Sequence, residues 1–194
     1  RGATIRVDPG DGVTPVQSVK PLVRTRGYEI GVRSEVLAGW QSTLSLWQLD
    51  AASELLFVGD AGTTEASRPS RRYGVEWTNL YVLADWLAID ADLAWSHARF
   101  RDHDPLVGDF IPGAVTTTAN IGVTLDHLGP WFGALRLRYF GPRPLREDGG
   151  LRSASSALTN LRVGYRLAPK TQLALDVYNL FDRKVNDIEY WYDS

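Results

Sequence analysis

The sequence predicts an all-β protein, an antiparallel up-and-down meander of about eight strands that forms a segment of a transmembrane β-barrel. Apolar residues recur at every second position along most of the chain. The connections between these runs alternate between short and long, and large aromatic residues gather near the ends of the runs. A period of two gives each strand one apolar and one polar face. No stretch keeps the period of an amphipathic helix.

Composition narrows the class of protein. The chain has 194 residues, enough for one large domain, and it has no Cys, which excludes disulfides and Cys-bearing zinc sites. A net charge of −2 gives no reason to expect nucleic acid as a partner. No apolar run reaches the roughly 18 residues of a membrane-spanning helix. The mean hydropathy of −0.20 fits a membrane barrel and a soluble β protein equally well.

The chain divides into a short lead-in and one incomplete barrel domain. Residues 1–24 are expected to be irregular, because Pro9-Gly10-Asp11-Gly12 and Pro15 are turn and breaker signals. Residues 25–194 are expected to form the barrel segment. Its predicted strands are residues 25–37, 40–58, 71–83, 86–100, 116–128, 131–141, 156–168 and 171–181.

The connections between these strands differ in length. Short ones such as Ala84-Asp85 and Gly129-Pro130 alternate with long polar ones at about 59–70, 101–115 and 142–155. An outer-membrane barrel shows this alternation, with tight periplasmic turns and long outer loops. One run breaks the pattern, since Trp47 falls on the opposite parity to Leu46, and a bulge or bend is expected near residues 50–52.

Two interpretations fit the alternating faces. In a soluble protein the apolar face is the core, whereas in a membrane barrel it meets lipid and the charged face lines the lumen. The aromatic residues favour the membrane, because many lie near strand ends, where interfacial girdles belong. These are Tyr28, Trp40, Tyr73, Trp86, Trp131, Tyr139 and Tyr165.

Several segments together resemble one family. The segment 175–184, which reads Leu-Asp-Val-Tyr-Asn-Leu-Phe-Asp-Arg-Lys, resembles the penultimate barrel strand of TonB-dependent outer-membrane receptors. Residues 28–33 and 71–76 look like that family's Gly-x-Glu strand openings, and 138–145 is similar to a late strand and loop there. The resemblance covers about residues 20–190.

The resemblance implies a C-terminal part of a barrel of about 22 strands, lacking the plug and the final strand. It implies the outer membrane of a Gram-negative cell, and uptake of a scarce ligand such as a ferric siderophore. The implied partners are the missing plug and barrel strands, outer-membrane lipid or lipopolysaccharide, and the TonB energy-coupling protein through the absent N-terminal region. No enzymatic activity, cofactor or nucleic-acid partner is expected.

No ligand-binding site can be identified from the sequence, but the predicted outer loops hold candidates. They are Asp102, His103, Asp104, Arg143 and Arg146. Asp102-His103-Asp104 places two carboxylates beside one imidazole, which suits a surface ligand or a metal chelate, and equally a solvated polar loop. A resident metal site is not expected, because it needs two or three convergent ligands.

The charged parity is expected to be a hydrated lumen wall. Asp90 and Asp92 are neighbours on one strand face, and we interpret them as part of this wall and not as a general acid–base pair. Mixed signs suggest cross-strand pairs and contacts to a plug. The other members are Glu29, Arg33, Glu76, Arg136, Arg138, Arg162, Arg166 and Asp176. A basic cluster at residues 67–72 suits either lipopolysaccharide phosphates or a solvated strand start.

Two other classes of protein remain open at this point. The first is an independent eight-stranded barrel, either a small membrane barrel or a soluble barrel that binds an apolar ligand. The second is a barrel-embedded enzyme, which would need a nucleophile beside a His, and none of the three His aligns with a Ser on one predicted face.

Overall fold

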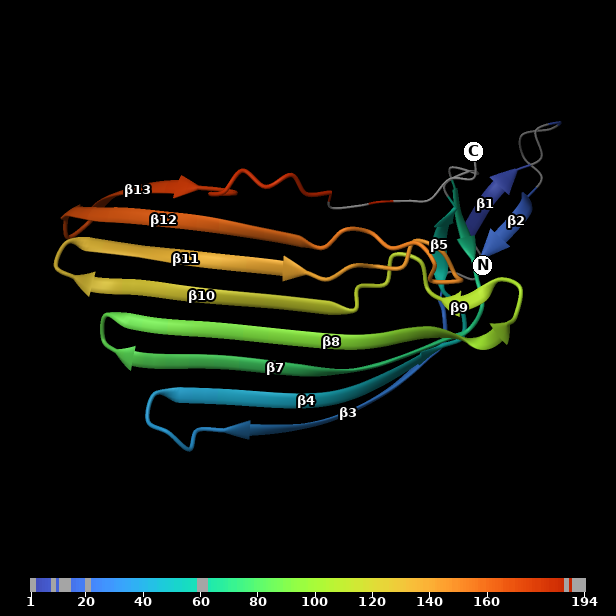
Figure 1. The fold of residues 1–194 in the computed structure, drawn as a ribbon, viewed down its shortest axis with the longest axis horizontal. Coiled ribbons are helices and arrows are strands. Elements are labelled where there is room, and N and C mark those ends of the chain that lie inside the picture. The colour runs from blue at the N-terminus through green and yellow to red at the C-terminus, as the bar shows by residue number, and fades with distance from the viewer. Residues whose placement is uncertain are drawn as a thin grey trace.

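The computed structural model describes residues 3–7, 10, 15–19, 22–58, 63–186 and 189. Within these ranges there is no helix able to cross a membrane. One antiparallel sheet dominates the molecule, and its long strands pair in chain order (Figure 1). They are β3 (Thr25–Ser34), β4 (Trp40–Ala51), β7 (Ser70–Ala84), β8 (Leu87–Asp104), β10 (Thr117–Leu128), β11 (Trp131–Phe140), β12 (Ser156–Ala168) and β13 (Thr171–Val177). The predicted antiparallel meander is therefore confirmed.

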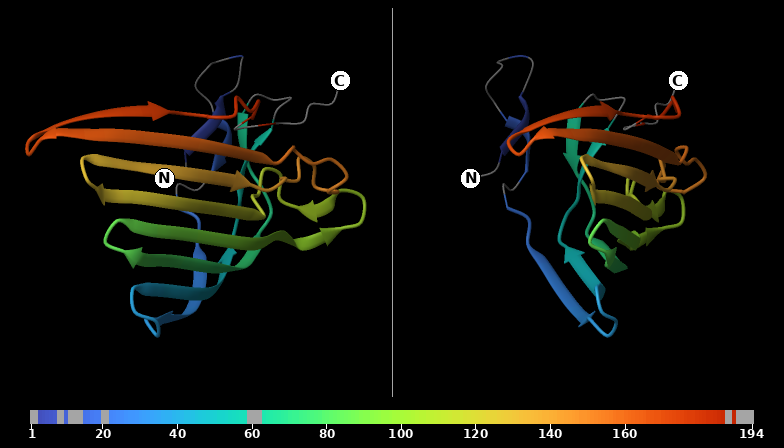
Figure 2. Two further views of the ribbon diagram at one scale, coloured as in Figure 1. Left: turned by 60° about the vertical axis from the view of Figure 1, so that its left-hand side comes forward. Right: turned by 90° about the vertical axis from the view of Figure 1, so that its left-hand side faces the viewer.

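The sheet is bent into an open arc (Figure 2). Strands β3 and β13 end the pairing order, and in the described part of the chain neither pairs along its outer edge. The sheet therefore does not have the form of an independent, closed eight-stranded barrel.

The smaller strands lie at the end of the sheet opposite the short turns (Figure 1). They are the hairpins of β1 (Ala3–Val7) with β2 (Pro15–Val19) and β5 (Leu55–Val58) with β6 (Thr63–Ala66), and β9 (Gly108–Phe110) on β8.

The expectation that residues 1–24 are wholly irregular is thus wrong, because they contain the β1–β2 hairpin. Pro15 begins β2, where its missing N–H is tolerated. Strands of five residues are too short to show a clear period of two. The Pro and Gly residues of this segment were therefore the stronger signal, and they predicted an irregular chain.

The bend expected near residues 50–52 is confirmed. Strand β4 leaves the ladder after Ala51, and the chain then turns into β5, which pairs with β6 instead of with the main sheet. The predicted run 40–58 is therefore two strands, and Trp47 lies on the face opposite to Leu46.

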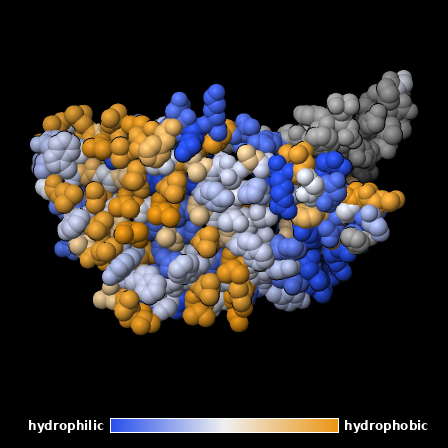
Figure 3. Space-filling model, viewed as in Figure 1, coloured by the Kyte–Doolittle hydropathy of each residue, from blue (hydrophilic) through white to orange (hydrophobic). Residues whose placement is uncertain are grey.

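The convex face of the sheet is apolar and exposed. Figure 3 shows hydrophobic side chains gathered over the strands toward the turn end, with hydrophilic ones at the loop end. One cross-strand row on this face contains Val32, Leu44, Trp77 and Leu93, all of them exposed. The buried apolar core of the described residues is small by comparison, consisting of Ala98, Phe100, Ile111 and Ala114. Exposed apolar surface of this extent marks an interaction with another apolar medium or molecule.

Aromatic residues on this face gather at both strand ends. Near the turns, the rings of Trp131 and Tyr165 meet edge to face with centroids 4.7 Å apart. Near the loops, the Tyr73 ring lies 5.0 Å from that of His97 and 6.2 Å from that of Trp95. The apolar band is thus bordered on both sides by aromatic rings, as in interfacial girdles.

On the concave face, glycines make room for aromatic rings. Phe132 and Gly164 are cross-strand partners, and a Cβ added at Gly164 would lie 2.1 Å from the Phe132 ring. Trp47 covers Gly74 in the same way, with 2.9 Å between its ring and an added Cβ. Such pairs bury the exposed backbone of a strand glycine beneath a ring.

The Asn-Leu-Phe-Asp corner ends the last strand at Val177, four residues before the predicted end at 181. Asn179 and Asp182 have φ values of 52° and 48°, which these two residue types tolerate better than most. The Asn179 side chain closes the turn, because Nδ2 donates to the Arg183 carbonyl at 3.0 Å and Oδ1 accepts from the Arg183 N–H at 2.9 Å. The corner therefore needs an Asn for both its backbone and its side chain.

Replacing Asn179 tests this account of the corner. We expect Asn179→Ala to lower the free energy of unfolding by about 2 kcal/mol, since it loses two hydrogen bonds and retains an unfavourable φ. Asn179→Gly keeps the conformation and loses only the hydrogen bonds, so its effect is smaller. Urea unfolding of the chain in detergent micelles, followed by Trp fluorescence, measures both. If the glycine variant is less stable than the alanine variant, the positive φ at position 179 is not a source of the destabilisation.

The Phe132–Gly164 pair predicts strong coupling between the two positions. We expect Gly164→Val to destabilise the sheet by about 1–3 kcal/mol through overpacking against the ring. In a Phe132→Ala background the same substitution has space, so its cost is smaller by at least about 0.5 kcal/mol. Additive effects in this double-mutant cycle, measured by urea unfolding, show that the ring does not cover the glycine.

Candidate functional site

The concave face carries charged side chains in cross-strand rows. Arg162 on β12 and Asp176 on β13 occupy paired positions. The Arg162 guanidinium donates from Nε to Oδ1 at 2.6 Å and from Nη2 to Oδ2 at 2.9 Å. This two-point geometry is the strongest form of an arginine–carboxylate pair and fixes both side chains on the wall.

A second pair spans an entire intervening strand. Asp90 on β8 and Arg136 on β11 flank Gly122 on β10 in one row, and Arg136 Nη1 donates to Asp90 Oδ2 at 3.1 Å. A Cβ at Gly122 would lie 2.4 Å from Asp90 Oδ1. The glycine therefore opens the path through which the carboxylate crosses to the arginine.

A third pair lies at the turn end. Arg166 Nη2 donates to Asp126 Oδ1 at 2.6 Å, and the guanidinium lies 4.9 Å from the centre of the Phe132 ring. The other wall charges behave differently. Within the described ranges Glu29, Arg33 and Glu76 form no ion pair, and Arg138 lies over Phe140 at 5.4 Å.

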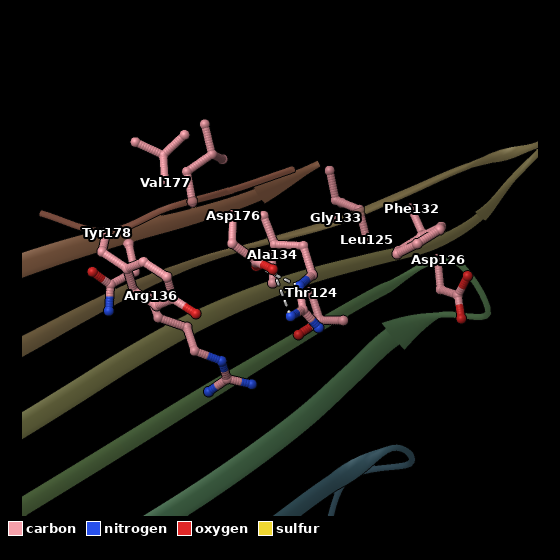
Figure 4. Close-up of a pocket in the computed structure, with 13 residues that line it drawn as sticks. Thr124, Leu125, Asp126, Phe132, Gly133, Ala134, Arg136, Asp176, Val177 and Tyr178 are labelled. Carbon is pink, nitrogen blue, oxygen red and sulfur yellow. Dashed lines mark hydrogen bonds and ion pairs between the residues drawn. The ribbon is translucent and has the colours of Figure 1, made fainter. Parts of the chain in front are cut away.

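The paired charges border an open pocket of about 450 Å³ on the wall of β10 to β13. Figure 4 shows Asp126, Arg136 and Asp176 on one side of the sheet, while Val177 points to the other. The polar lining is Thr124, Asp126, Arg136, Asn160, Arg162, Asp176 and Tyr178. This lining offers hydrogen bonds and fixed charges to a polar partner. Asp90 pairs with Arg136, which supports its interpretation as a wall residue.

Three of the predicted loop candidates make contacts within their own loops, Asp104 and Arg146 through their side chains and Arg143 through its backbone. Asp104 Oδ1 accepts the Leu106 N–H at 2.8 Å and closes the turn into β9. The Arg143 N–H donates to Ser153 Oγ at 3.0 Å, and Arg146 pairs with Asp148 at 2.9 Å. Asp102 is exposed, and the side chain of His103 lies outside the described structure.

No group of three His, Cys, Asp or Glu residues in the described part of the chain is placed to hold a metal ion.

Arg68 joins the loops at 101–115 and 142–155. This role of Arg68 was not predicted from the sequence. Its guanidinium donates to the carbonyls of Asp102 and Gly108, both at 2.9 Å, and pairs with Glu147. It also lies 4.3 Å from the centre of the Phe100 ring. The loops at 101–115 and 142–155 therefore meet around one arginine, so that their candidate residues belong to the same end of the sheet.

The basic cluster at 67–72 is accordingly divided among three places. Arg68 lies between the loops, Arg72 pairs with Glu54 at 3.0 Å, and Arg71 pairs with Asp50 at 2.7 Å on the convex side. The three different positions of these arginines could not be predicted from the sequence, because their partners lie on other strands and loops.

Comparison with known proteins agrees with this architecture. The family model described as TonB dependent receptor-like, beta-barrel matches residues 8–180. A search of curated proteins found no match to the chain.

Solved structures share the fold. The ferric-catecholate import receptor Fiu from E. coli K12 has a TM-score of 0.66 at 19% identity, over 93% of this chain and 26% of its own. The copper transporter OprC has a TM-score of 0.67 at 21% identity, over 92% of this chain and 28% of its own. The ferric yersiniabactin uptake receptor FyuA from Yersinia pestis has a TM-score of 0.67 at 20% identity, over 82% of this chain and 25% of its own. The chain spans about a quarter of the length of these structures. It belongs to the TonB-dependent receptor-like β-barrel family.

Proposed function

We propose that the chain is part of the barrel wall of a TonB-dependent receptor in a Gram-negative outer membrane. The whole receptor takes up a scarce ligand such as a ferric siderophore. One observation carries the proposal: long loops lie at one end of an open sheet with an exposed apolar face and a charged opposite face. The similar structures are named as receptors or transporters for iron chelates or copper, which supports a metal chelate as the ligand.

In the part of the chain that the structure describes, the outer edges of β3 and β13 are open, which implies further strands. Unpaired N–H and C=O groups are not tolerated in lipid, so a membrane sheet must close. In the proposed receptor the remaining barrel strands pair with both edges and complete the wall.

The concave wall is proposed to face the lumen and the plug. Bidentate and cross-strand pairs such as Arg162–Asp176 keep charges fixed in a hydrated interior. Wall residues without an ion pair in the described structure, such as Arg33 and Glu76, are available to polar groups of the plug. Movement of the plug by TonB would then exchange polar contacts of similar strength, which keeps the wall intact during transport.

The outer loops are proposed to capture the ligand. Arg68 holds the loops at 101–115 and 142–155 together, so Asp102, His103 and Asp104 share one mouth with Arg143 and Arg146. Arginine binds anionic chelates through charge-assisted hydrogen bonds.

Uptake of radiolabelled iron tests the proposed function. The complete receptor carrying this segment is expressed in a strain without its own siderophore receptors, with and without TonB. We expect uptake of at least one ferric siderophore, and loss of that uptake without TonB. Uptake that continues without TonB, or no uptake from a panel of ferric siderophores, contradicts the proposal.

A pair of arginine substitutions tests the proposed mouth. We expect Arg143→Gln with Arg146→Gln to weaken ligand binding roughly tenfold, because charge-assisted hydrogen bonds to the ligand are lost. Lys170→Gln, in the turn at the opposite end of the sheet, removes a charge as a control and leaves binding unchanged. Equal binding by wild type and the double variant, measured by Trp fluorescence titration, removes these arginines from the site.

A further inference from the structure

A row of charged residues crosses the convex face at the loop end of the sheet. Arg26 on β3, Asp50 on β4, Arg71 on β7 and Arg99 on β8 are successive cross-strand partners. Arg24, in the segment just before β3, lies two residues from Arg26, and Arg101 lies two residues beyond Arg99 on β8. We call the five arginines the outer basic patch. Its members come from three strands and the segment before β3, so no sequence cluster contains it.

The outer basic patch borders the aromatic row directly. Tyr28, Gln48, Tyr73 and His97 form the next cross-strand row on the same face, one alternation closer to the turns. The Tyr73 and His97 rings lie 5.0 Å apart. Aromatic rows mark the level at which hydrocarbon gives way to headgroups, so the arginines lie at headgroup level.

The outer basic patch has an excess of positive charge. Arg71 Nε lies 2.7 Å from Asp50 Oδ1, and Arg99 Nε lies 3.4 Å from Asp109 Oδ1. Within the described residues Arg24, Arg26 and Arg101 form no ion pair and are exposed. Asp50 accepts hydrogen bonds from Arg71 Nε at 2.7 Å and from Nη2 at 3.3 Å, which orients the Arg71 guanidinium.

Two adjoining pockets give the outer basic patch its depth. One, of about 370 Å³, is lined by Arg24, Arg26, Asp50, Arg71 and Arg101. The other, also about 370 Å³, is lined by Arg71, Tyr73, His97, Arg99 and Arg101. Because both pockets share Arg71 and Arg101, two anionic groups can bind side by side between guanidinium groups.

We propose that the outer basic patch binds the phosphate groups of a phosphorylated glycolipid of the outer leaflet, of the lipopolysaccharide class. Arginine presents a planar fork of donors that matches phosphate oxygens. Basic groups just beyond an apolar span attract anionic headgroups. The inference rests on the proposed function in one respect, since it places the convex face in an outer membrane.

Two arginines of the basic cluster at residues 67–72 do not belong to the outer basic patch. Arg68 is held between two outer loops, and Arg72 pairs with Glu54. Of the three arginines in the segment 67–72, only Arg71 belongs to the outer basic patch.

Binding of diphosphoryl lipid A tests the outer basic patch. Native mass spectrometry of the complete receptor in detergent micelles measures binding of diphosphoryl lipid A, dephosphorylated lipid A and inorganic phosphate. The test variant combines Arg26→Gln with Arg101→Gln. The control combines Arg33→Gln with Arg138→Gln, which removes the same charge from the concave face. We expect about tenfold weaker lipid A binding for the test variant, no change for the control, and a strong preference for the phosphorylated lipid.

The proposal is overturned by equal lipid A binding in the test variant and wild type, by equal weakening in the control variant, or by equal binding of dephosphorylated lipid. Binding of inorganic phosphate as tight as that of lipid A identifies a free-anion site and also overturns it. TonB-dependent uptake by wild type and by the test variant is measured in parallel. If wild type binds lipid A through phosphate but shows no TonB-dependent uptake, the proposed transport function fails and the outer basic patch stands.

Discussion

Backbone pairing is the constraint on which the rest of this structure depends. A continuous antiparallel order runs from β3 to β13, and every long strand between them pairs with a neighbour on both edges. Since side chains alternate with a period of two, a slip of one residue in any ladder would exchange the apolar and charged faces of that strand. The register thus decides the two surfaces together. Among the described residues the outer edges of β3 and β13 are unpaired, which explains why this sheet fits within a larger barrel.

The same register places chemistry on each surface. On the concave side it aligns Asp90, Gly122 and Arg136. Because Gly122 has no side chain, the two charged groups can meet across its strand. On the convex side it sets the arginine row beside the aromatic row, where Arg71 and Tyr73 are neighbours on one face. Phe132 over Gly164 shows that even the smallest residues of the wall are specified by their cross-strand partners.

The main strands, their order and the bend after β4 could be predicted, because long alternating runs report directly on a two-faced sheet. The Asn179 corner was recognised as a motif, but its φ value and its closure on Arg183 required the structure. Long-range pairs could not be predicted. Arg68 and Glu147 are 79 residues apart, and a guanidinium in a loop carries no local signal of its partner. The same limitation explains why Arg68 and Arg71 looked alike in sequence and lie in different places.

The orientation of the two faces is the central claim, and quenching of single tryptophans by brominated lipids tests it most directly. Trp77 lies on the convex face and is 44% exposed, whereas Trp47 covers Gly74 on the concave face. In the complete receptor in bilayers, a variant whose only tryptophan is Trp77 is expected to be quenched strongly by brominated acyl chains. A variant that retains only Trp47 is expected to be insensitive to them. Strong lipid quenching of Trp47 with none of Trp77 would contradict the account.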